Sequence, residues 1–371
     1  MKKGKSITEL YTELERERKA RKDMVADTRS MKVATEDGAT LLSVGRGKKK
    51  EEYQVSEVAH RQLADRLQIP FKYYQRMQEA YPALLDLNVN GWLQKSGERR
   101  MLRTMDGRLR AFLSDRYRRL DNLELADAIL PTIAQMREAD ILSAEVTETH
   151  MYIKVLNKSL KAEVDKGDVV QAGFVISNSE IGLGAVKVEP LIYRLVCRNG
   201  LIVKDYGTKK YHAGRQISTL DEAYELYSDQ TMLADDKAFF LKVNDIVKTA
   251  VDEAKFNLCV TKLQAAKRHS MGDDPVQAVE VLGDRYILTK NERASILRHF
   301  IMGGDISQYG LINAVTRASQ DVADYDRATD LERLGGEMLS LPASALKEEK
   351  YAEVIEEPVS PNNSNILRLR A

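Results

Sequence analysis

The chain has 371 residues, 43% of them hydrophobic and 30% charged, with a formal net charge of +1 at pH 7. This composition predicts a soluble globular protein with one large domain or two, and the near-neutral charge requires that any attraction to nucleic acid come from local patches. The chain has no run of about eighteen apolar residues and no apolar leader, which excludes a membrane span and predicts a cytoplasmic protein.

Residues 1–55 are predicted to form a charged helical N-terminal region that ends in a basic loop. Apolar residues recur at helical spacing from Ile7 to about Ala26, within a run rich in Glu, Lys and Arg. The segment 45–50, which reads Gly-Arg-Gly-Lys-Lys-Lys, then breaks the helical pattern and is typical of a surface loop.

Two helices separated by Pro70 are predicted next. The pair resembles a helix-turn-helix, in which the second helix presents Lys72, Gln75 and Arg76 to a DNA groove. Large apolar residues on that second helix favour a packing corner over a helix that reads sequence. Trp92, the only tryptophan, follows shortly after and is expected in the core.

The segment from Arg99 to Arg119 holds eight Arg, no Lys and two Asp. Asp106-Gly107 is a turn signal between two short apolar runs, so a β-hairpin is predicted, with arginines projecting from one face. Arginine is suited to bidentate contact with phosphate, which indicates a nucleic-acid backbone surface. Pairing of the arginines with acidic neighbours is the alternative, and the sequence leaves both open.

Strand signals dominate the remainder of the predicted core, which extends over residues 56–215. A helix begins at Asp121-Asn122, and alternating apolar residues then favour a mainly antiparallel central sheet. Asn199-Gly200 is predicted either as a hairpin turn or as the end of a short buried helix. The overall class is therefore α+β, with helical N-terminal and C-terminal regions.

The C-terminal part of the chain is predicted to be helical and then flexible. Few helix breakers occur from Leu220 to about Thr261, and another helical stretch starts at Gly310. Residues 216–341 are therefore predicted as a helical region packed on the core. Residues 342–371 are rich in Glu and then in loop-forming residues, which predicts a flexible tail.

Enzyme and metal motifs are scarce. Cys197 and Cys259 lack CxxC spacing, and the five histidines show no HxxxH or HExxH arrangement. The chain has no GxxxxGK[ST], GxGxxG or GxSxG motif. We expect no metal, cofactor or catalytic residue. A metal-dependent nuclease built on carboxylates such as Asp168 and Glu180 is the less favoured alternative.

Four motifs in one order resemble a phage and plasmid family known as domain of unknown function 932. They are Arg-Tyr-Arg-Arg-Leu-Asp-Asn at 116–122, Ser-Asn-Ser-Glu-Ile-Gly at 177–182, Arg-Leu-Val-Cys-Arg-Asn-Gly-Leu-Ile at 194–202 and His-Ala-Gly at 212–214. The likeness extends from about Glu57 to Leu341. The resemblance implies carriage by mobile elements and supplies no catalytic residues.

These patterns together predict a non-catalytic nucleic-acid-binding protein of phage or plasmid replication or recombination. Single-stranded DNA is the favoured partner, because cations can hold its phosphates while aromatic rings stack on its bases. A single-strand binding or annealing protein that forms a homo-oligomer in the host-cell cytoplasm is expected. The predicted contact residues are Arg99, Arg100, Arg103, Arg108, Arg110, Arg116, Tyr117, Arg118, Arg119, Lys209, Lys210 and Tyr211.

The alternative function is a phage host-takeover or anti-defence protein that binds a host protein. Its support is the long helical portion after Leu220 and the acidic start of the tail.

Overall fold

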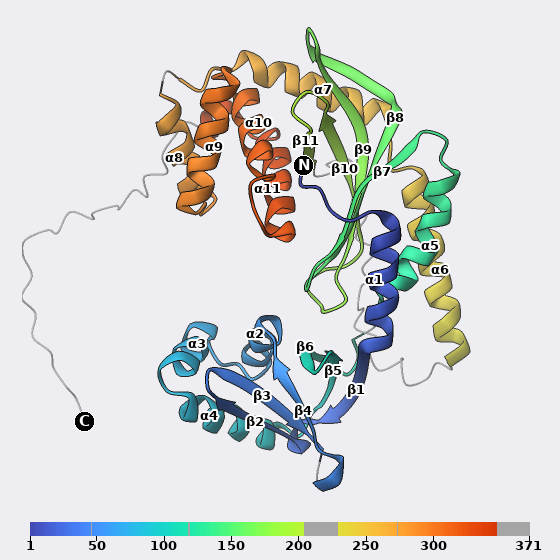
Figure 1. Ribbon diagram of the computed structural model, residues 1–371, viewed down its shortest axis with the longest axis vertical. Coiled ribbons are helices and arrows are strands. Elements are labelled where there is room, and N and C mark those ends of the chain that lie inside the picture. The colour runs from blue at the N-terminus through green and yellow to red at the C-terminus, as the bar shows by residue number, and fades with distance from the viewer. Residues whose placement is uncertain (46, 118, 204–228, 273, 347–371) are drawn as a thin grey trace, which may run out of the picture.

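The computed structural model describes residues 1–45, 47–117, 119–203, 229–272 and 274–346. In these ranges the chain forms two lobes, each built on its own β-sheet (Figure 1). Helix α1 (Ile7–Ala20) lies on the upper lobe and leads directly into the first strand of the lower lobe. The predicted α+β class with mainly antiparallel pairing is confirmed, and the strands are divided between two sheets.

The lower lobe combines a six-stranded sheet with three helices on one of its faces. Within this sheet only β4 and β6 pair in parallel, and the strand order is β1-β5-β6-β4-β3-β2. Leu42, Leu63, Leu102 and other buried residues form the core between sheet and helices. The elements are β1 (Arg21–Asp27), β2 (Met31–Glu36), β3 (Ala39–Val44), β4 (Glu51–Val55), β5 (Arg99–Met105), β6 (Arg108–Ser114), α2 (Glu57–Arg66), α3 (Phe71–Ala80) and α4 (Pro82–Ser96).

Helix α4 shields the β2 edge of the lower sheet with side chains at every fourth residue. Asn90 bonds both backbone groups of Val33, at 2.7 and 2.8 Å, and Asp86 accepts from the Thr35 N–H at 2.9 Å. Gln94 donates to the next β2 carbonyl along, at 3.3 Å. The spacings agree because four helical residues rise about 6 Å and two strand residues about 6.6 Å. The helix therefore blocks this edge against pairing with another strand.

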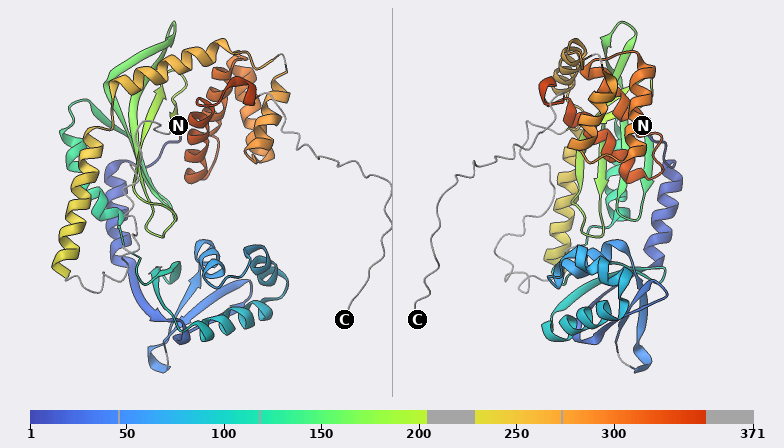
Figure 2. Two further views of the ribbon diagram at one scale, coloured as in Figure 1. Left: turned by 180° about the vertical axis from the view of Figure 1, so that it is seen from behind. Right: turned by 90° about the vertical axis from the view of Figure 1, so that its left-hand side faces the viewer.

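The upper lobe contains a five-stranded antiparallel meander with helices on both faces (Figures 1 and 2). Helices α1, α5, α6 and α7 pack on one face, and α11 packs on the other face and against β11. Lys154 of β8 donates to Glu332 of α11 at 2.6 Å, and both side chains are fully buried. The elements are β7 (Ala139–Val146), β8 (Met151–Asp165), β9 (Asp168–Asn178), β10 (Lys187–Arg194), β11 (Asn199–Ile202), α5 (Asn122–Gln135), α6 (Asp229–Lys248), α7 (Glu253–Arg268), α8 (Pro275–Arg285), α9 (Lys290–Gly303), α10 (Gln308–Ala318) and α11 (Tyr325–Met338).

Three predicted boundaries differ from the structure. The first helix ends at Ala20, because the residues from Arg21 onward pair with β5. Asn199 and Gly200 begin strand β11, while the turn before them is formed by 195–198. The predicted N-terminal region 1–55 contributes β1 to β4 to the same sheet as β5 and β6.

Candidate nucleic-acid interface and the junction of the lobes

Strands β5 and β6 form the predicted arginine hairpin. Asp106 and Gly107 both adopt positive φ, +51° and +73°, as a two-residue hairpin turn of the primed type requires. A β-bulge follows, because Arg103 is opposite Ala111 whereas the next residue is opposite Leu109. A bulge changes the direction of a side chain, and this one brings Arg110 to the same carboxylate-bearing loop as Arg103.

Arg103 is buried between the lobes and is only 1% exposed. Its guanidinium donates to the Asp121 carboxylate and to the backbone carbonyl of Glu180, both at 2.7 Å, and lies 3.2 Å from the Asp23 carboxylate. Asp121 is the N-cap residue of α5, but its side chain makes no capping bond and faces the arginines instead. Arg103 therefore has internal partners and no access to a phosphate chain.

Glu180 is the centre of the buried network. Its carboxylate accepts from the Asn122 backbone N–H at 2.7 Å and from Arg110 and Arg21 at 3.2 and 3.4 Å. Arg110 is 5% exposed, so it too is an internal residue. The hydroxyl of Tyr117 donates to the Glu180 carbonyl at 3.3 Å, and burial raises the pKa of this tyrosine. For Arg103, Arg110 and Tyr117 the structure supports pairing within the protein.

Glu17 brings one more carboxyl group to this network from the last turns of α1. Burial raises its pKa from 4.5 to about 7, and the Glu180 charge acts in the same direction while Arg110 opposes it. The Glu17 Oε2 and the Arg110 Nε are both buried without a hydrogen-bond partner in the described part of the chain. The junction thus contains a carboxyl group that titrates near neutral pH.

The second sequence motif, 177–182, makes the other contacts of the junction. Gln62 of α2 donates to the Ile181 carbonyl at 2.7 Å and accepts from the Phe112 N–H at 2.8 Å, which ties this loop to the lower lobe. Gly182 has φ +80°, and a Cβ there would lie 2.7 Å from a methyl group of Leu113. Within the motif, Asn178 donates to the Leu120 carbonyl at 2.9 Å and the Ser179 hydroxyl accepts from the Leu183 N–H at 3.3 Å, so its polar groups bond the backbone of turns.

The third motif joins the end of the upper sheet to helix α10. Arg194 donates to the Asp168 carboxylate at 2.6 Å, and the Tyr309 hydroxyl donates to the same carboxylate at 2.7 Å. Asn199 donates to the Thr316 hydroxyl at 2.6 Å. These residues have structural partners on the upper lobe and lie apart from the arginine hairpin.

Other predicted contact residues in the described ranges lie at the surface, although the Arg100 side chain is only 15% exposed. Arg99 and Arg116 are open to solvent and have no ion pair among the described residues. The register places Arg100 opposite Ser114, so both exposed arginines lie at the open end of the hairpin. Arg100 pairs with Glu98 there, Arg108 pairs with Glu148 at 3.2 Å and Arg119 lies 3.5 Å from Asp23. Arg118, Lys209, Lys210 and Tyr211 lie outside the described residues.

The prediction that Trp92 lies in the core is wrong, because the residue is 45% exposed. The core stripe of α4 is Leu85, Val89 and Leu93, and Trp92 lies off that stripe. The Lys95 ammonium is 5.1 Å from the centre of the Trp92 ring. Trp92 is three residues after Val89 and seven after Leu85, so helical spacing alone places it at the margin of the core stripe and does not predict its exposure.

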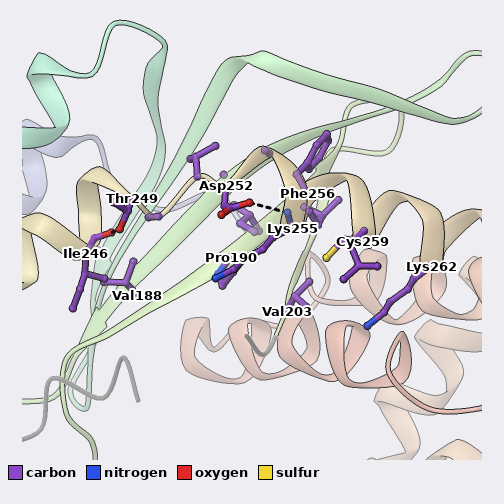
Figure 3. A pocket seen from close by; sticks show the side chains of 17 residues that line it. Val188, Pro190, Val203, Ile246, Thr249, Asp252, Lys255, Phe256, Cys259 and Lys262 are labelled. Atoms are coloured by element: carbon purple, nitrogen blue, oxygen red, sulfur yellow. Dashed lines mark hydrogen bonds between the residues drawn. The ribbon is translucent and has the colours of Figure 1, made fainter. Parts of the chain in front are cut away.

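A cavity of about 170 Å³ lies between β10 and α7 (Figure 3). Its wall is largely apolar, with Pro190, Val203 and Phe256 among the lining residues, and Lys262 also borders it. None of the predicted contact residues in the described ranges lines this cavity. The described ranges also hold no group of three or more His, Cys, Asp or Glu that could bind a metal. In the same ranges no helix has the length and apolarity to cross a membrane.

The chain is a protein of two α+β lobes joined by buried arginines and carboxylates. It belongs to the family described as domain of unknown function (DUF932), whose model matches residues 111–338. The family suggested by the sequence motifs is confirmed, and the match begins at Ala111 rather than near Glu57. No curated protein and no solved structure matches the chain.

Proposed function

We propose that the protein binds single-stranded nucleic acid through the open end of the arginine hairpin, defined by Arg99, Arg100 and Arg116. The supporting observation is the separation of charge between the lobes. Residues 21–114, the lower lobe, carry 18 Lys and Arg against 12 Asp and Glu, whereas the rest of the chain carries 39 against 44. A polyanion is therefore attracted to the lobe that presents Arg99, because Arg99 and Arg116 have no ion pair among the described residues and can release its counterions.

The biological setting of this proposal is phage or plasmid replication or recombination. Annealing of complementary strands requires no nucleotide hydrolysis, because base pairing provides the free energy. Self-association through the charged terminal helices is part of the same proposal, and single-stranded DNA is the favoured partner.

A salt series tests the proposal. Fluorescence anisotropy of a labelled single-stranded oligonucleotide should show a log affinity that falls with log salt by about 0.7 for each phosphate contacted. Replacing two exposed arginines, Arg99→Glu with Arg116→Glu, should weaken binding and reduce that slope by about 1.4.

The matched control is Lys237→Glu with Lys242→Glu, which makes the same change of charge on the exposed side of α6 in the upper lobe. It should leave the affinity nearly unchanged. Binding that is absent or insensitive to salt contradicts the proposed function. An equal loss in the control contradicts the assignment to the hairpin.

A partner-binding role is the second candidate function. It is favoured by large apolar side chains that are exposed on α8 and α9, namely Val276, Ile301 and Met302. Apolar side chains exposed in this way mark many protein–protein surfaces. A complex held by such contacts persists at high salt, where phosphate contacts are lost, so the salt series distinguishes the two functions.

A further inference from the structure

We propose that Trp92 is a stacking platform for an unpaired base, which makes a single strand rather than a duplex the substrate of the lower lobe. This inference rests on the proposed function and adds the kind of nucleic acid that the site selects.

Three faces of helix α4 account for the position of the ring. One face packs in the core, and a second, with Asp86 and Asn90, bonds the edge of β2. Trp92 and Leu87 are exposed on the remaining surface, and a Cβ at Gly91 would have no heavy atom within 4 Å. A tryptophan that is nearly half exposed beside this open space is available to a planar ligand.

One cation lies over the ring, and two arginines lie at or just beyond the end of the helix that carries it. Lys95 lies over it at 5.1 Å, a cation–π distance, and α4 then ends at Gly97 in a left-handed C-cap. A Cβ at Gly97 would lie 3.2 Å from the Arg29 Nε, so the Arg29 side chain crosses the end of the helix. Arg99 begins strand β5 two residues later. Lys95 and Arg99 thus follow the ring within seven residues of the chain and can hold phosphates on a strand stacked against it, whereas Arg29 is paired with Asp27 at 2.7 Å.

The positive charge near Trp92 also indicates which kind of ligand binds there. A symmetric contact with the same surface of a second copy would bring the same cations together, and like charges repel. An intact duplex covers the faces of its bases by stacking them on each other, so it offers a tryptophan ring only its ends. A single strand supplies both phosphates for the cations and free base faces for the ring.

The single tryptophan provides a direct test, since all tryptophan emission comes from Trp92. Titration of the full chain with unlabelled oligo(dT) should change that emission in parallel with the anisotropy of a labelled strand. A duplex of the same length should bind more weakly and change the emission little. Trp92→Ala should weaken single-strand binding about 5- to 160-fold, the range expected for loss of one stacked base.

Two matched variants complete the test. Trp92→Phe keeps a ring and should retain most of the affinity. Tyr73→Ala removes a ring with the same exposure, 45%, from α3 and should change the affinity little. Unchanged thermal melting of Trp92→Ala establishes that the variant is folded.

The outcomes separate the two proposals. Two results would overturn the Trp92 platform and leave the proposed function standing. One is single-strand binding by the parent protein that leaves the tryptophan emission unchanged. The other is normal single-strand binding by Trp92→Ala. Equal affinity for duplex and single strand also overturns the platform. No binding of either nucleic acid overturns the proposed function itself.

Discussion

Arg103 and Arg108 are five residues apart in one hairpin, and burial gives them opposite roles. Arg103 is 1% exposed and faces the carboxylates of Asp121 and Asp23, whereas the Arg108 side chain is 49% exposed and has one partner, Glu148. A buried charge must be paired, because the interior solvates it poorly, while an exposed ion pair contributes little. The number of arginines in a segment therefore does not show which of them are buried ion-pair partners and which are exposed.

Glu17 carries a prediction on pH at the same scale. Its pKa is raised to about 7, so between pH 4.5 and 7 the folded chain binds more protons than the unfolded chain. The stability contributed by this group is present below pH 4.5 and is lost as the pH rises through 7. Glu17→Gln cannot ionise, so at pH 8 it should be more stable than the parent by on the order of 1 kcal/mol, reduced by solvent that reaches the side chain.

Urea unfolding at pH 5 and pH 8 measures this effect. The two proteins should be closer in stability at pH 5 than at pH 8. Glu13→Gln is the control, because Glu13 pairs with Arg16 and has a lowered pKa. A Glu17→Gln protein that is less stable than the parent at pH 8 contradicts the assigned ionisation.

At the scale of elements, local chemistry was predictable from the sequence and long-range pairing was not. The hairpin was recognised because Asp106-Gly107 specifies its turn within two residues. The sequence predicts a helix to about Ala26, because nothing local shows that the residues from Arg21 onward pair with β5, some eighty residues away. Asn199-Gly200 has the composition of a turn, but Asn199 bonds Thr316 of α10 and lies in a strand.

Two helical glycines give opposite predictions for the same substitution. Gly91→Ala on α4 adds a methyl group in open space and should stabilise the protein by about 0.5–1 kcal/mol, because glycine is a poor helix former. Gly336→Ala on α11 should destabilise it, because the new Cβ would lie 1.9 Å from the backbone oxygen of Ile202. Thermal melting of both variants checks the pair. Similar shifts in the same direction would contradict the close approach of α11 to β11.

For the whole molecule, the candidate site was predictable only in part. The arginine-rich segment was recognised from its composition, but its division into buried and exposed residues depends on Asp121 and Glu180, which the fold brings from the other lobe. The family match covers 111–338 and so includes the junction side of β6 and the upper lobe. Trp92 and Arg99 lie outside that span. The proposed binding surface is therefore placed mostly on the part of the chain that the family model does not cover.

The junction leads to the last prediction, which concerns how the lobes are coupled. Each lobe has a core of its own, and a small apolar cluster that includes Met101, Leu113 and Ile181 joins them beside the buried charges. Arg103→Ala leaves the carboxylates of Asp23 and Asp121 short of a partner and should lower the free energy of unfolding by about 3–5 kcal/mol.

The matched variant in the same hairpin is Arg108→Ala, which should cost less than about 1 kcal/mol because its ion pair is exposed. Urea unfolding measures both changes. Hydrogen exchange locates them, because in Arg103→Ala the loss of protection should concentrate in β5, β6 and the loop around Glu180, while the centre of the upper sheet stays protected. Equal stability of the two variants would show that the buried network does not couple the lobes. Uniform loss of protection across both sheets would show instead that they unfold as one unit.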